Sequence, residues 1–199
     1  MDKLHPLNFP MVVHSLEVNK DRFQPIEENE QLLSPKVSYL NAIGALMYIA
    51  NCTRPNITFY VNLLARYNHA TITRYWNKIK HILWYLHGTS DMSLCYSKES
   101  KSQLIRYVDI GYLSNLHKAR SQTRYVFTYE NVAILWRSIK HTMVVTSSNH
   151  SKILAIHEAR HECVWLRYMI KHIQEFYKLS SIKDTLTILH KDNVACIAK

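Results

Sequence analysis

The segment 136–173 constrains the fold most, because its residue pattern predicts the end of a strand, a short turn and one long helix. Apolar residues recur there at alternating steps of three and four, which places them on one helix face. They are Ile156, Ala159, Cys163, Leu166, Ile170 and Ile173. Ser147, Ser148 and Asn149 offer side-chain oxygens for the N-cap. The sequence therefore predicts a helix over Asn149–Lys178 that packs its apolar face on a sheet.

Charge and hydropathy limit the classes of protein that the chain can belong to. The 199 residues carry a formal net charge of +10, which favours a polyanionic partner such as nucleic acid. A solvated basic surface without a ligand explains the same charge. No apolar run reaches about 18 residues, and the N-terminus lacks the pattern of a signal peptide. We therefore expect an intracellular protein, cytoplasmic or nuclear, with no membrane partner.

The cysteine pattern indicates neither a zinc ribbon nor a disulfide framework. The four cysteines are widely spaced and form no CxxC pair. A reducing interior is the simpler interpretation.

The first half of the chain reads as a linker followed by helices. Residues 1–36 are polar and contain several prolines, so we expect an extended or disordered linker. Residues 37–90 predict helices over Tyr39–Asn51, after Pro55 and from Thr73 onward, with Gly88 as the C′ residue of the third. A plain helical bundle that packs on the next domain is compatible with this pattern.

Residues 91–199 predict a mixed sheet with packed helices. Short segments rich in β-branched and aromatic residues are typical of strands. They are Ser93–Lys98, Leu104–Asp109, Tyr125–Glu130, Ala133–Arg137 and Thr185–His190. Glu130 and Asn131 favour a tight turn, so the strands on either side are expected to form a hairpin. A last helix is expected to begin within Asn193–Lys199. The predicted fold class is α/β (α+β).

Several stretches resemble the Pol polyproteins of copia-type retrotransposons. AIGALMYIANCTRPNI and YLHGTSDMSLCYSK resemble the region that joins reverse transcriptase to the nuclease. KARSQTRYVF, WRSIKH, VVTSSNHSKILAIHEA and ECVWL resemble the ribonuclease H domain, although Arg124 stands where that pattern has glycine. The resemblance implies the helical end of reverse transcriptase over 37–90 and a truncated ribonuclease H-like domain over 91–199, from a transposable element.

The resemblance also implies a damaged metal site. In this family, ribonuclease H cleaves the RNA of RNA–DNA hybrids with Mg²⁺, and clustered carboxylates hold the ions. Asp109 and Asp192 match the first and third acidic positions, Lys152 replaces the second, and the fourth would lie beyond Lys199. We expect Lys152 to pair with Asp109 or Asp192, so that the chain binds no Mg²⁺ and is an inactive pseudoenzyme. Aspartates that merely cap strand ends are the alternative.

Two other functions remain open from the residues. His157-Glu158-Ala159-Arg160-His161 has the H-E-x-x-H spacing of zinc proteases, but the sequence offers no third ligand at the expected positions. This is a remote alternative. The other is a non-catalytic nucleic-acid-binding module that holds RNA–DNA hybrid weakly. Its phosphate contacts would come from these basic residues: Arg137, Lys140, His141, Arg74 and Lys78.

Overall fold

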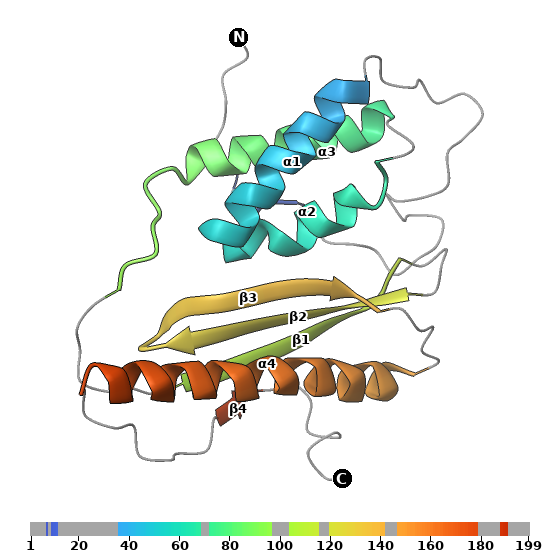
Figure 1. Ribbon diagram of the computed structural model, residues 1–199. Coiled ribbons are helices and arrows are strands. Elements are labelled where there is room, and N and C mark those ends of the chain that lie inside the picture. Colours follow the sequence, from blue (N-terminus) through green and yellow to red (C-terminus); the bar gives the residue numbers. More distant parts are fainter. Residues whose placement is uncertain are drawn as a thin grey trace. The chain divides into compact units, whose positions relative to one another are not determined.

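The computed structural model describes residues 7, 9–11, 36–68, 72–96, 104–115, 120–141, 147–178 and 188–190. The described part of the chain divides into two compact units. The first holds the helices up to residue 94, and the second holds the sheet and the long helix (Figure 1). Among the described residues, no helix combines the length and the apolar character that crossing a membrane requires.

The first unit is built from helices. They are α1 (Lys36–Cys52), the 3₁₀ turn η2 (Pro55–Ile57), α2 (Thr58–Ala65) and α3 (Thr73–Gly88). Pro55 opens η2, as predicted, because proline lacks only a donor that the first turn leaves unpaired. The prediction for Gly88 was wrong. Gly88 is the last residue of α3 and has no positive φ, and the N–H of Thr89 bonds to the carbonyl of Leu86 instead.

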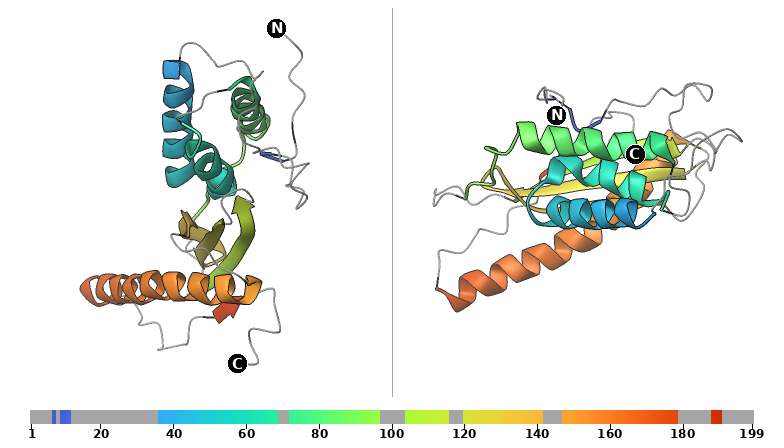
Figure 2. Two further views of the ribbon diagram at one scale, coloured as in Figure 1. Left: turned by 90° about the vertical axis from the view of Figure 1, so that its right-hand side faces the viewer. Right: turned by 90° about the horizontal axis from the view of Figure 1, so that it is seen from above.

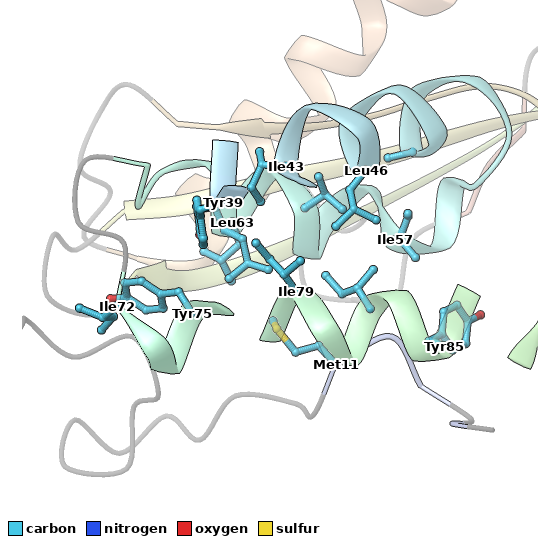
Figure 3. Packing of buried hydrophobic residues seen from close by; sticks show 14 residues of the cluster. Met11, Tyr39, Ile43, Leu46, Ile57, Leu63, Ile72, Tyr75, Ile79 and Tyr85 are labelled. Carbon is cyan, nitrogen blue, oxygen red and sulfur yellow. The ribbon is translucent and has the colours of Figure 1, made fainter. Parts of the chain in front are cut away.

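The core of the first unit lies between its helices (Figure 3). Tyr39 is fully buried on α1, and its hydroxyl donates a hydrogen bond of 3.0 Å to the carbonyl of Leu64 on α2. Ile79 and Ile82 contribute the buried face of α3. Met11 packs into the same core, although it comes from the segment expected to be a linker. Most of that segment lies outside the described residues.

The second unit contains a four-stranded sheet in the order β3-β2-β1-β4. Its strands are β1 (Leu104–Asn115), β2 (Arg120–Tyr129), β3 (Val132–Lys140) and β4 (Ile188–His190). The predicted hairpin is confirmed: β2 and β3 are antiparallel, and Glu130 and Asn131 take φ values of 52° and 65°, as a tight hairpin turn requires. β1 and β4 are parallel, with Ile105 beside Ile188. The mixed α/β class is therefore confirmed.

Helix α4 (Ser148–Phe176) covers one face of this sheet (Figures 1 and 2). Ser147 caps it as predicted, because its hydroxyl accepts a hydrogen bond of 3.2 Å from the amide of His150. The buried line runs at steps of four residues and is mostly small. It consists of Ser151, Ala155, Ala159 and Cys163. Small side chains allow the helix backbone to approach the sheet closely.

The predicted apolar face of α4 is therefore only partly right. Ala159 and Cys163 are buried, and Leu166 and Ile170 are partly buried against the sheet. Ile156 is only partly buried and does not join this core, and Ile173 is 46% exposed. Apolar residues occupy more than one face of this helix, so apolar spacing alone did not identify the face that packs on the sheet.

Other sequence predictions fare differently. The strand Ser93–Lys98 was wrong in its described part, because Ser93–Tyr96 has no regular structure. β1 continues well beyond the predicted end at Asp109. The helix expected within Asn193–Lys199 lies outside the described residues.

Candidate functional site

Asp109 lies on β1 and points away from α4. Successive side chains of a strand alternate between the two faces of the sheet. Val108 packs in the core with α4, so Asp109 projects from the opposite face. Its carboxylate forms an ion pair with the guanidinium of Arg124 on β2 and accepts a hydrogen bond of 2.7 Å from the amide of Ile110. The residue that stands where the family pattern has glycine is therefore the partner of Asp109.

Lys152 lies in the first turn of α4, on the helix that covers the other face of the sheet. The Asp109 side chain and the helix that carries Lys152 therefore lie on opposite faces of the sheet. The expected ion pair between Lys152 and Asp109 does not occur among the described residues, and Arg124 takes that place. Asp192 lies outside the described residues.

The described residues do not fit a site for two Mg²⁺ ions. Such a site needs several carboxylates close together. Of the two matched aspartates, the structure describes only Asp109, and its carboxylate is already paired with the guanidinium of Arg124. Arg106 adds a second cation, which is buried on β1 on the face toward α4. Within the described ranges, no three His, Cys, Asp or Glu side chains come together as a metal-binding group.

Arg137 connects β3 to α4. Its guanidinium donates a hydrogen bond of 3.0 Å to the carboxylate of Glu162. The phenol of Tyr125 lies beside this pair, and burial raises the pKa of Tyr125 to about 12. The neighbouring Tyr125 is also the main reason why the pKa of Arg137 is raised. The Arg137 side chain keeps 61% of its surface exposed, so it can still face a phosphate.

His141 is buried and lies just after β3. Its Nε2 shares a hydrogen bond with the hydroxyl of Thr123, and its Nδ1 has no partner among the described residues. Burial lowers the pKa of His141, and the nearby carboxylate of Glu158 opposes that shift. Only 3% of His141 is exposed, so the imidazole offers a phosphate almost no surface, which is a poor match to the binding role expected from the sequence. Lys140 is half-buried beside it.

Arg74 and Lys78 belong to α3, in the first unit. The Arg74 guanidinium carbon lies 5.5 Å from the centre of the Tyr75 ring, and the Lys78 ammonium lies 5.8 Å from it. Both distances suit a cation–π contact. Arg137, Lys140 and His141 belong to the second unit. The predicted basic residues are thus distributed over both units.

His157 and His161 occupy one exposed face of α4, with ring centres 4.9 Å apart. Glu158 does not join them: its Oε2 is buried without a partner among the described residues, and its charge acts on His141. A zinc protease needs this glutamate beside the metal-bound water. The geometry gives the protease alternative no support.

Three relatives place the chain among known proteins. It is 31% identical over 173 residues to the retrovirus-related Pol polyprotein from transposon TNT 1-94 of Nicotiana tabacum, covering 87% of this chain and 13% of that protein. It is 32% identical over 130 residues to the secreted RxLR effector protein 161 of Plasmopara viticola, covering 65% of this chain and 92% of that protein.

The third is the retrovirus-related Pol polyprotein from transposon RE2 of Arabidopsis thaliana, 29% identical over 134 residues, which cover 67% of this chain and 9% of that protein. The chain thus spans only a small part of either transposon polyprotein. No family model matches the sequence. No solved structure matches it either.

Proposed function

Because the chain belongs to the family that includes retrovirus-related Pol polyproteins of transposons, we propose that it is a ribonuclease H-like relic without nuclease activity. In this proposal, residues 37–90 correspond to the end of a reverse transcriptase and residues 91–199 to the ribonuclease H-like domain. Residues 1–36 correspond to the linker that the sequence predicts, although Met11 packs in the core of the first unit.

The arrangement of the second unit supports this assignment. The chain makes β1 and the β2–β3 hairpin, then α4, and returns to pair β4 in parallel with β1. Three strands, a helix and a further strand in this order are what the resemblance implies for a ribonuclease H-like sheet. Of the residues matched to the family, Asp109 lies on β1 and Lys152 lies near the start of α4, which supports the proposed assignment.

The ion pair between Asp109 and Arg124 is the main observation in favour of a loss of nuclease activity. Phosphodiester cleavage by two metals depends on concentrated negative charge. Here the first acid is neutralised by a cation, and Lys152 replaces the second acid. The chain accordingly holds no Mg²⁺ and cleaves no hybrid.

Affinity for nucleic acid is the property that remains in this proposal. The net charge of +10 favours weak, salt-sensitive binding of RNA–DNA hybrid. Arg137 and Lys140 of the second unit, and Arg74 and Lys78 of the first, supply the phosphate contacts. A non-catalytic nucleic-acid-binding module is the competing interpretation, and the burial of His141 does not distinguish the two.

The test is a cleavage assay with purified chain, labelled RNA–DNA hybrid and Mg²⁺. The Asp109→Asn variant gives the background from contaminating nucleases. We expect identical, negligible cleavage by both proteins. Cleavage by the unchanged chain that disappears in Asp109→Asn would show a working metal site and would refute the proposal.

A further inference from the structure

Two histidines of α4 stand one helical turn apart on its exposed surface. His157 and His161 are four residues apart, the spacing at which side chains of neighbouring turns meet. Both are exposed, so a ligand in solution can reach their rings. Their rings are nearly perpendicular, at 77°, with centres 4.9 Å apart.

This separation is compatible with a shared metal ion. A zinc–imidazole bond of about 2.0–2.1 Å puts the ring centre about 3.2 Å from the metal. Two such rings are about 4.5 Å apart when their bonds meet at a right angle, and about 5.2 Å apart at the tetrahedral angle. The observed 4.9 Å lies between these limits. The distance between the ring centres therefore allows one nitrogen of each ring to bind the same ion once the rings are turned toward it.

We propose that His157 and His161 form a two-histidine site for a divalent transition metal, Zn²⁺, Cu²⁺ or Ni²⁺, with water completing the coordination. Imidazole suits these metals, whereas Mg²⁺ prefers oxygen ligands. Among the residues that the structure describes, no carboxylate joins the pair, since Glu158 is turned toward the sheet and Glu162 is paired with Arg137. The site binds metal and clamps two turns of α4, and it has no general base for hydrolysis.

This site is independent of the proposed function. It depends on imidazoles of the outer face of α4, whereas the nuclease assignment depends on Asp109 across the sheet. Failure of one proposal therefore leaves the other intact. The metal site is tested with Zn²⁺ and histidine variants, whereas the nuclease assignment is tested with Mg²⁺ and Asp109→Asn.

The first test is a titration of the full chain with Zn²⁺ at pH 7.5. Thiols are alkylated beforehand, because Cys52 and Cys95 are exposed and thiolates bind the same metals. Replacing either His157 or His161 with Ala should weaken binding roughly 100-fold, the loss expected when one of two linked contacts is removed. His172→Ala is the matched control, because His172 is exposed on the same helix with Tyr168 as its ring neighbour.

The second test uses fluorescence to locate the ion. Trp165 is 53% exposed and follows His161 by one turn, so Cu²⁺ bound at the pair should quench its emission. Trp165→Phe should remove the quenching while leaving Zn²⁺ affinity unchanged, and Mg²⁺ should produce neither effect. Affinity that survives both histidine replacements, or falls equally in His172→Ala, would overturn the proposal. Circular dichroism checks that each variant keeps its helices.

Discussion

Arg124 on β2 and Asp109 on β1 form an ion pair on the sheet face that α4 does not cover. The two side chains keep 37% and 51% of their surface exposed. Water therefore screens their attraction, so the pair matters for what Asp109 can bind more than for how stable the sheet is.

Replacing Arg124 with Gln should consequently change the free energy of unfolding by no more than about 1 kcal/mol, as for other exposed ion pairs. Urea unfolding of the unchanged chain, Arg124→Gln, Asp109→Asn and the double variant gives the coupling between the two residues. A coupling well above about 1 kcal/mol would contradict this view of a surface pair.

Replacing Ala159 with Leu should destabilise the chain by about 1–3 kcal/mol, because the larger side chain has no space between α4 and the sheet. Ala159 is fully buried in the packed line of the helix. Val164→Leu is the matched control, since Val164 is 63% exposed and its replacement should stay within about 0.5 kcal/mol. Equal midpoints of urea unfolding for the two variants would show that α4 does not pack as described.

Leu166→Ala should cost less than the replacement of a fully buried leucine, which is about 2–5 kcal/mol. The reason is that Leu166 is only partly buried against the sheet. Thermal or urea unfolding measures the difference, and a loss within the full range would place Leu166 in the core.

Acid should destabilise the second unit through His141. Burial lowers the pKa of this imidazole in the folded chain, so the unfolded chain binds the proton more tightly. The contribution to stability is complete above the unfolded pKa of about 6.5 and is lost as the pH falls below it toward the folded pKa. His141→Gln should flatten this part of the profile in urea unfolding between about pH 5 and 8. An unchanged slope would show that Glu158 offsets the burial of His141.

Hybrid binding should depend on partly exposed cations such as Lys78 and should not depend on His141. Lys78→Gln should lower the slope of log affinity against log salt by about one, because one phosphate contact is lost. His141→Gln should leave that slope unchanged, since the imidazole is buried. Fluorescence anisotropy with labelled hybrid at several salt concentrations measures both slopes.

Local signals were sufficient to predict several elements of the structure. Ser147 predicts the start of α4 because its hydroxyl bonds to the amide of His150, three residues later. Glu130 and Asn131 predict the turn of the hairpin because they adopt its positive φ values themselves. Pro55 predicts a helix start because proline lacks only a donor that the first turn leaves unpaired.

The arrangement of side chains across the sheet could not be predicted in this way. The partner of Asp109 depends on which strand lies beside β1 and which face each residue occupies, and a one-residue change in register would reverse those faces. The burial of His141 likewise depends on tertiary packing, which brings its ring to Thr123 on β2 and near Glu158 on α4. The sequence alone therefore could not decide whether Asp109 is free to bind a metal or whether His141 is free to contact a phosphate.

The parallel pairing of β1 with β4 has a consequence for synthesis and folding. The two strands are separated along the chain by the whole hairpin and by α4, so their contact closes late, after the local hairpin has formed. While the ribosome is still making the segment after α4, β1 is an unprotected edge with unpaired backbone groups. We expect nascent chains halted at this stage to associate by strand addition, and completion of β4 to end that vulnerability.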